Sequence, residues 1–288
     1  MKVSLVIPSF GMTHKLRKCL QTLNCQTVLP EEVIVVSPEC MNVPEFRFKL
    51  MEVKIKDRSR ISRALNLGIK LASQEVICFT DPDTLPSSDW IEKIIKVYES
   101  NPKLGGVGGR DQIYKNGELV LPKKVREVGK LSWFGRIIGN HHELSEGGRE
   151  VDFLKGCNMS FRRELIRDID EAIVGFYRWE HDLCFQVKNQ GYKLWHSPDI
   201  LVNHMKEEEE FSLGRFFAFS HNTTYILLKY LSWWKKIIFL LFTFLVGQRE
   251  NLGFLRSVLL IPSLRNFDLL ITCLLGKIKG ITTFFREH

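Results

Sequence analysis

Two carboxylates stand one residue apart, directly after a short apolar run, in the segment Asp81-Pro82-Asp83. The run at residues 76–79 has the length and composition of a buried strand. Side chains two residues apart in an extended segment point to the same side, so both carboxylates can converge on one point. Such a pair at the end of a strand can hold Mg²⁺ or Mn²⁺ and leave positions free for phosphate oxygens. The alternative is a turn in which Asp83 caps the following helix.

The elements around this pair alternate between apolar runs and amphipathic segments. Strands are predicted at residues 3–7, 33–36, 53–55 and 76–79, and helices at about residues 16–23, 64–72 and 90–98. Strands that alternate with crossover helices predict an α/β fold, a mainly parallel Rossmann-like sheet with helices on both faces. Ligands of such sheets bind beyond the carboxyl ends of the strands. Pro8, Ser9, Ser37 and Asp81 stand at these ends, which predicts a nucleotide pocket there.

Two common phosphate-binding motifs are missing from the sequence. No GxGxxG follows the first strand and no GxxxxGK[ST] occurs, which disfavours dinucleotide and P-loop chemistry. The glycines at 105, 106, 108 and 109 follow a predicted helix, and we expect a tight turn that runs into a strand. Residues 112–149 have a looser pattern, which indicates either a mobile loop over the site or a surface excursion. We expect His141 and His142 on the surface of that loop.

The C-terminal part of the chain is both basic and apolar. The net charge is +8, and residues 225–288 hold nine Lys or Arg against three Asp or Glu. Spanning a bilayer takes about 20 apolar residues, whereas the run at 237–246 has ten with Thr243 as its polar member. This pattern predicts amphipathic helices on an anionic membrane surface, with Trp233 and Trp234 at headgroup depth.

Other arrangements of this tail stay open. Its segments could bury one another, form the contact of a homo-oligomer, or enter the bilayer as a re-entrant or spanning hairpin. No nucleic-acid-binding motif accompanies the positive charge, so nucleic acid is not an expected partner. Seven scattered cysteines without a CxxC pair, and no secretory signal pattern, predict a reducing, cytosolic location.

Five segments in this order resemble motifs of the family-2 inverting nucleotide-sugar glycosyltransferases with the glycosyltransferase A-type fold. They cover roughly residues 1–210 and comprise Ile7-Pro8-Ser9-Phe10, Ala64-Leu-Asn-Leu-Gly-Ile69, residues 79–86, residues 156–163, and Glu180-His-Asp-Leu followed by Gly191-Tyr192. The chain departs from the family pattern at two places. Gly11 stands where the family usually has Asn, and Ser37-Pro38-Glu39 replaces the acids that often hold the nucleobase. The nucleobase therefore stays open.

The resemblance implies in-line attack of an acceptor hydroxyl on the anomeric carbon, which expels a nucleoside diphosphate. A divalent cation, Mg²⁺ or Mn²⁺, would stabilise the charge of this leaving group. The expected metal ligands are Asp83 directly, Asp81 on metal, water or ribose, and His204, whose alternative is a structural role. The expected general base is Glu180 or Asp182. We favour Glu180, since counting back from Gly191 places the family's adjacent Glu-Asp on Trp179-Glu180, whereas Asp182 matches a frequent later acid. Partial burial beside Trp179 is expected to raise the pKa of Glu180.

The donor-binding residues implied by position and resemblance lie at the ends of the first two strands and at the start of a helix. They are Pro8, Ser9, Phe10, Ser37 and one of Arg58, Arg60 and Arg63, with Arg63 as the candidate, besides Asp81. A guanidinium group suits phosphate. An arginine on a solvated helix face is the alternative for all three.

We therefore expect a metal-dependent inverting glycosyltransferase that moves a sugar from a nucleoside-diphosphate donor to a lipid-linked, glycan or membrane-proximal acceptor. Residues 1–210 would form the nucleotide-sugar-binding catalytic domain, and residues 211–288 a helical, membrane-associating region peripheral to the cytoplasmic face of the cell membrane. A sugar nucleotidyltransferase and a non-catalytic membrane scaffold are the alternatives. The sugar, the acceptor and the oligomeric state are not identified by the sequence.

Overall fold

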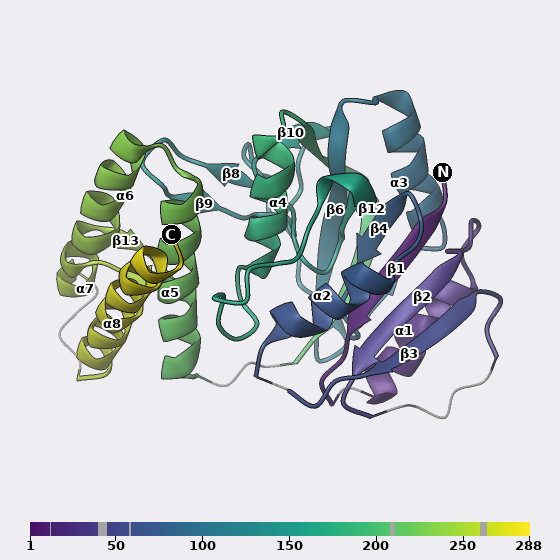
Figure 1. Ribbon diagram of the computed structural model, residues 1–288, viewed down its shortest axis with the longest axis horizontal. Helices are drawn as coiled ribbons and strands as arrows, with labels where there is room; N and C mark the ends of the chain where they lie inside the picture. Colours follow the sequence, from purple (N-terminus) through teal and green to yellow (C-terminus); the bar gives the residue numbers. More distant parts are fainter. Residues whose placement is uncertain (12, 40–44, 58, 208–210, 260–263) are drawn as a thin grey trace.

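A computed structural model of the protein shows a sheet with its covering helices on one side and a group of C-terminal helices on the other (Figure 1). The structure describes residues 1–11, 13–39, 45–57, 59–207, 211–259 and 264–288. The two parts meet around helix α4 (Trp179–Asn189) and the small strands β8 (Lys130–Leu131) and β9 (Ile137–Ile138).

The sheet combines a parallel half with a mixed half. In the described part of the chain it has ten strands, and the order of its main path is β10-β12-β6-β11-β4-β1-β2-β3. Strands β1 (Val3–Pro8), β2 (Glu32–Ser37), β3 (Lys49–Lys54) and β4 (Val76–Phe79) run parallel. Strand β11 (Met159–Arg162) lies antiparallel between β4 and β6 (Leu104–Lys115), and β6 pairs in parallel with β12 (Lys193–Lys206). The predicted α/β class with a mainly parallel sheet is confirmed.

Helices cover both faces of the sheet, as predicted. Leu5 and Ile7 of β1 face the layer that contains α1 (Thr13–Asn24) and α3 (Trp90–Ser100). Val6 between them faces the layer of α2 (Ile61–Leu71) and α4. Because side chains alternate along a strand, the continuous apolar run of β1 supplies both cores.

The glycines of β6 do not form the expected tight turn, so that prediction is wrong. They lie inside the strand, where neighbouring chain segments approach too closely for a side chain. A Cβ atom on Gly109 would lie 1.9 Å from the carbonyl oxygen of Ile200, and one on Gly108 would lie 2.6 Å from that of Asn158. Glycine inside a strand often marks such an approach.

The segment after β6 links the sheet to the C-terminal helices. It contains β7 (Glu118–Leu119), the β8–β9 pair and the edge strand β10 (Arg149–Val151). The Phe134 ring packs edge-on against Phe242 with centroids 4.8 Å apart. The backbone N–H of Ile137 donates to the Gln248 side chain at 3.2 Å. Residues 112–149 therefore contain more than a surface excursion.

Four helices form most of the C-terminal region. They are α5 (Leu213–Tyr230), α6 (Trp233–Leu245), α7 (Phe254–Leu259) and α8 (Leu264–Glu287), with the hairpin β13 (Gly247–Gln248) and β14 (Asn251–Leu252) between α6 and α7. Gly276 and Gly280 let α8 approach α5, since a Cβ atom at either position would lie 2.6 Å from a carbonyl oxygen of α5. Among the described residues, none of these helices combines the length and the apolarity needed to cross a bilayer.

Replacing Gly109 by alanine should destabilise the fold strongly, because the new methyl group would overlap the backbone of β12. We expect the free energy of unfolding to fall by about 1–3 kcal/mol or more in urea titrations. Gly139→Ala is the matched control. A Cβ atom there has no neighbour within 4 Å, so its effect should stay within about 0.5 kcal/mol. Equal stability of the two variants would contradict the close approach of β6 and β12.

Candidate active site

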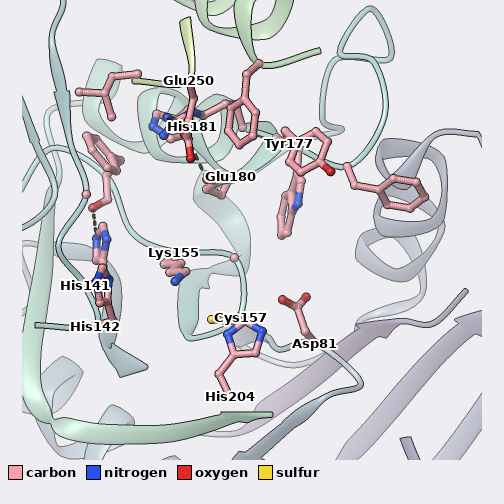
Figure 2. Close-up of a pocket in the computed structure, with 18 of the residues that line it drawn as sticks. Asp81, His141, His142, Lys155, Cys157, Tyr177, Glu180, His181, His204 and Glu250 are labelled. Atoms are coloured by element: carbon pink, nitrogen blue, oxygen red, sulfur yellow. Dashed lines mark hydrogen bonds and ion pairs between the residues drawn. The ribbon is translucent and has the colours of Figure 1, made fainter. Parts of the chain in front are cut away.

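A cavity of about 1000 Å³ lies beyond the carboxyl ends of β1 and β4. Its wall combines strand ends, the start of α4, the segment around β9 and the C-terminal region (Figure 2). The strand ends contribute Pro8 and Asp81 to the lining, and α4 contributes Glu180. The C-terminal region contributes Phe219 and Glu250. The cavity therefore joins parts of the chain that lie far apart in the sequence.

Asp81, Asp83 and His204 converge at one end of this cavity. One ligand atom from each lies within 4.8 Å of the others. A turn after β4 holds the acids, because the Thr84 hydroxyl and N–H both donate to the Asp81 carbonyl, at 2.6 and 3.2 Å. Thr84 begins β5 (Thr84–Pro86), whose pairing with β12 places His204 opposite Thr84. The N–H of Met205 fixes the same crossing by donating to the Asp83 carbonyl at 2.8 Å.

The two carboxylates differ in their electrostatic surroundings. Burial, together with the charge of Asp83, raises the pKa of Asp81 to about 6. Burial also raises the pKa of Asp83, but His204, whose Nε2 lies 3.5 Å from its Oδ1, outweighs this and lowers it. Two like charges this close repel each other unless a cation lies between them. The two carboxylates suit Mg²⁺ or Mn²⁺. An imidazole is a ligand for transition metals, so the full donor set fits Mn²⁺ better than Mg²⁺.

His204 also contacts a second carboxylate behind it. Its Nδ1 lies 3.6 Å from Oδ2 of Asp111, which is fully buried and forms an ion pair with Lys155. Burial lowers the pKa of His204, but Cys157 and the carboxylates of Asp111 and Asp83 raise it to about 12. A cation bound at Nε2 would compete with a proton at that nitrogen. One ligand atom each of Asp111, Cys157 and His204 also lies within 4.8 Å of the others.

Glu180 lies in the first turn of α4 and lines the same cavity. The preceding Trp179 is buried against Phe79, with ring centroids 6.0 Å apart, which fixes the start of the helix. Burial raises the pKa of Glu180, but His181, with Nδ1 3.3 Å from Oε1, and Arg178 lower it below its usual value. The expected upward shift is therefore wrong, because the adjacent His181 and the charge of Arg178 outweigh burial. The carboxylate stays ionised and can accept a proton.

Asp182 does not line this cavity. It is fully buried and accepts hydrogen bonds from Lys229 at 2.9 Å and Tyr230 at 2.7 Å, both in α5. The N–H of Asp170 donates to its other oxygen at 3.0 Å. Asp182 thus joins α4 to α5, and of the two candidate bases Glu180 is the one at the cavity.

The candidate donor-binding residues divide into two groups. Pro8 and Phe10 line the cavity, as does Asp81, whereas Ser9 and Ser37 are buried beside it without lining it. Arg63 is half exposed and pairs with Asp57 at 2.6 Å and Glu171 at 2.9 Å, outside the cavity lining. Its neighbour Arg60 donates to the Glu171 carbonyl, and Arg58 lies outside the described residues.

Several lining residues were not expected from the sequence. His141 is buried, with Nε2 3.1 Å from the Phe153 carbonyl oxygen, so its predicted place on a loop surface is wrong. The C-terminal region supplies a further set that sequence patterns assigned to a membrane-facing tail, namely Arg215, Phe219, Gln248, Arg249, Glu250 and Arg256. No local motif marks these residues, because only the fold of the tail brings them to the cavity.

Comparison with known proteins agrees with this geometry. The model of glycosyl transferase family 2 matches residues 4–170. A glucosyl-dolichyl phosphate glucuronosyltransferase of Haloferax volcanii is 25% identical over 225 residues, 71% of this chain and 69% of the relative. A poly-beta-1,6-N-acetyl-D-glucosamine synthase of Staphylococcus aureus is 23% identical over 175 residues, 58% of this chain. The match covers 41% of that synthase, so the chain spans less than half of its length.

Two solved structures share the fold. GalNAc-T7 with UDP, GalNAc and Mn²⁺ superposes with a TM-score of 0.68 at 12% identity, over all of this chain and 56% of that one. S. aureus TarS 1–349 in complex with UDP-GlcNAc superposes with a TM-score of 0.61 at 15% identity, over all of this chain and 92% of that one. These neighbours confirm the glycosyltransferase A-type fold. Because the family model matches more than half of the sequence, the chain belongs to glycosyl transferase family 2 and is a glycosyltransferase.

Proposed function

We propose that the protein is a metal-dependent inverting glycosyltransferase that uses a nucleoside-diphosphate sugar. The observation that carries this proposal is the convergence of Asp81, Asp83 and His204 at one end of a cavity that Glu180 also lines. GalNAc-T7, a protein of the same fold, is described with UDP and Mn²⁺. The sugar and the base of the donor stay open, so UDP serves below as a probe.

The donor diphosphate would lie at the Asp81–Asp83 end. When bound there, Mg²⁺ or Mn²⁺ supplies Lewis-acid stabilisation of the departing diphosphate. Lys15, Lys155 and Lys206 also line the cavity. Lys155 pairs with Asp111 and Lys15 with Glu207, so a diphosphate would compete with these acids for the two ammonium groups. The diphosphate needs no glycine-rich loop for its binding.

Glu180 would act as the general base. An inverting displacement needs one carboxylate to take the proton of the attacking hydroxyl, and Glu180 is held ionised by its neighbours. Asp182 is buried, accepts hydrogen bonds from Lys229 and Tyr230, and does not line the cavity. We therefore propose Glu180 and not Asp182 for this role.

The acceptor would be lipid-linked or membrane-proximal, with the C-terminal region against the cytoplasmic face of the membrane. This region exposes large apolar side chains, among them Trp233, Ile237, Leu241, Phe254, Leu259, Phe267 and Phe285. Lys235 lies over the ring of Trp234, a pairing that suits a lipid headgroup layer. The name of the Haloferax relative includes a dolichyl phosphate. We propose residues 1–210 as the donor part and 211–288 as the membrane-associating part.

Asp83→Asn should abolish metal-dependent donor binding, because it removes the charge of the expected direct ligand. In wild-type protein, UDP with Mn²⁺ should raise the melting temperature by mass action, and the variant should lose this rise. Activity, read as release of nucleoside diphosphate, should fall at least about 100-fold. Asp199→Asn, at an exposed position, is the control. An unchanged UDP–Mn²⁺ shift in Asp83→Asn would refute the ligand role, and release of pyrophosphate would favour a nucleotidyltransferase.

Glu180→Gln and Asp182→Asn should separate the two candidate bases. Glu180→Gln should lower kcat by about 10²–10⁴ while the melting temperature and the UDP–Mn²⁺ shift persist. Asp182→Asn should lower the free energy of unfolding by about 1–3 kcal/mol, because its partners lose a buried charged acceptor. Stopped-assay kinetics and urea unfolding give the two readouts. The assignment fails if folded Asp182→Asn loses turnover and Glu180→Gln keeps it.

The double variant Trp233→Ser/Leu241→Ser should bind membranes more weakly than wild type. Both side chains are more than half exposed, and an apolar side chain that enters the interface contributes about 1.5–3 kcal/mol. We expect at least a tenfold loss of partition into vesicles of phosphatidylglycerol and phosphatidylcholine in sedimentation assays. Leu121→Ser, an 82% exposed position outside the C-terminal region, is the control. Wild-type protein that stays in the supernatant would contradict the proposal.

A further inference from the structure

The cavity has a second cationic wall, away from the acid pair. Four arginines from separate segments line it, and we call them the arginine wall: Arg178 before α4, Arg215 in α5, Arg249 in the β13–β14 turn and Arg256 in α7. Glu250 lies among them, with its carboxylate oxygens 3.3 Å from Arg178 and 3.8 Å from Arg215. Figure 2 shows Glu250, Glu180 and Tyr177 in the upper part of the cavity, away from His204 and Asp81 in the lower part.

The arginine wall has unused hydrogen-bonding capacity. Within the described ranges, Nε of Arg178 and Nε of Arg256 are buried and have no hydrogen-bond partner. A buried N–H without an acceptor is unfavourable, and an oxyanion would satisfy it. The C-terminal region contributes one acid to this wall, Glu250, and three of the four guanidinium groups. The charge and the free donors both favour an anionic ligand.

Aromatic rings hold two of these guanidinium groups in place. Arg178 lies 5.1 Å above the ring of Phe219, and Arg215 lies 5.4 Å from the same ring and 5.6 Å from that of Tyr177. Tyr177 and Phe219 stack with centroids 4.5 Å apart. A stacked guanidinium keeps its N–H groups oriented, which lowers the entropy cost of binding an oxyanion.

The backbone of Arg178 is unusual as well. Its φ is +66°, in the left-handed region that a side chain disfavours. Such a conformation persists where the surroundings hold it, and it is frequent at ligand sites. Here it starts α4, so that Arg178 and Glu180 both reach the cavity from one short segment.

We propose that the arginine wall binds the phosphate group of the acceptor. This inference rests on the proposed function, in which the donor diphosphate lies at the Asp81–Asp83 end and Glu180 acts on the acceptor hydroxyl. The residues of the arginine wall, which lie away from the Asp81–Asp83 end, would then face the acceptor. The exposed ring of Phe176, two residues before Arg178, lines the same cavity and can contact an isoprenyl chain or a sugar beside that phosphate.

The test uses the full chain loaded with Mn²⁺ and UDP. Farnesyl phosphate and glucose 1-phosphate are titrated separately, and binding is read by calorimetry and by the melting temperature. At least one of the two should bind, and farnesol should bind much more weakly. Arg178→Gly, whose glycine suits the left-handed backbone, and Arg215→Gln should each weaken that binding about 10- to 100-fold. Both variants should keep the UDP–Mn²⁺ shift, and Arg286→Ala, an exposed arginine of α8, should match wild type.

The outcomes separate this inference from the proposed function. Binding of farnesyl phosphate alone supports a lipid phosphate, and binding of glucose 1-phosphate alone supports a water-soluble acceptor. The arginine wall is refuted as an acceptor site if neither probe binds, if farnesol or inorganic phosphate binds equally well, or if both arginine variants lose the UDP–Mn²⁺ shift while folded. If wild type shows no UDP–Mn²⁺ shift, the proposed donor chemistry fails, whereas probe binding that depends on Arg178 and Arg215 still supports the phosphate site.

Discussion

The position of one imidazole, that of His204, connects the sheet to the chemistry of the site. Its ring lies between two carboxylates, with Asp83 3.5 Å from one nitrogen and Asp111 3.6 Å from the other. Two strands and a turn must meet for this arrangement: β12 carries His204, β6 carries Asp111, and the turn from β4 to β5 carries Asp83. In the proposed metal site, Asp111 behind His204 would orient its ring, and the Asp111–Lys155 ion pair holds that carboxylate in turn.

The sequence was most informative where the chemistry is local. Asp81 and Asp83 are two residues apart at a strand end, so their convergence follows from strand geometry alone. The choice between Glu180 and Asp182 required the orientation of helix α4 relative to the cavity. Residues two apart on an α-helix point in nearly opposite directions. In α4 this places Glu180 at the cavity and Asp182 against Lys229 and Tyr230.

Long-range contacts account for the failed predictions about the β6 glycines and about His141. The glycines of β6 suggest a turn in isolation, whereas the crossing of Ile200 over Gly109 explains them in the fold. His141 stands in a stretch of loose pattern but is buried against Phe153, and its place depends on how residues 112–149 return to the sheet. The pKa of Glu180 failed for a local reason, because the effect of burial was expected but that of the adjacent His181 and of the charge on Arg178 was not.

The C-terminal region exposes large apolar side chains and also lines the cavity, and its composition alone could not separate these two properties. Its basic and apolar character predicted a surface on a membrane, and α6, α7 and α8 do expose large apolar side chains. The same region turns Arg215, Phe219 and Glu250 into the cavity beside α4. We infer that one segment can both hold the protein near a lipid surface and shape the end of the cavity where an acceptor would enter. The pairing of α5 with α4 through Lys229 and Asp182 supports this geometry.

A crystal structure of the protein grown with Mn²⁺ and UDP, with anomalous data collected for manganese, tests the central claim most directly. We expect one anomalous peak within coordination distance of Asp83 and of Nε2 of His204, with the diphosphate of UDP on the cavity side of the ion. A peak between Asp111 and Cys157, or a diphosphate bound without any ion beside Asp83, would contradict the account.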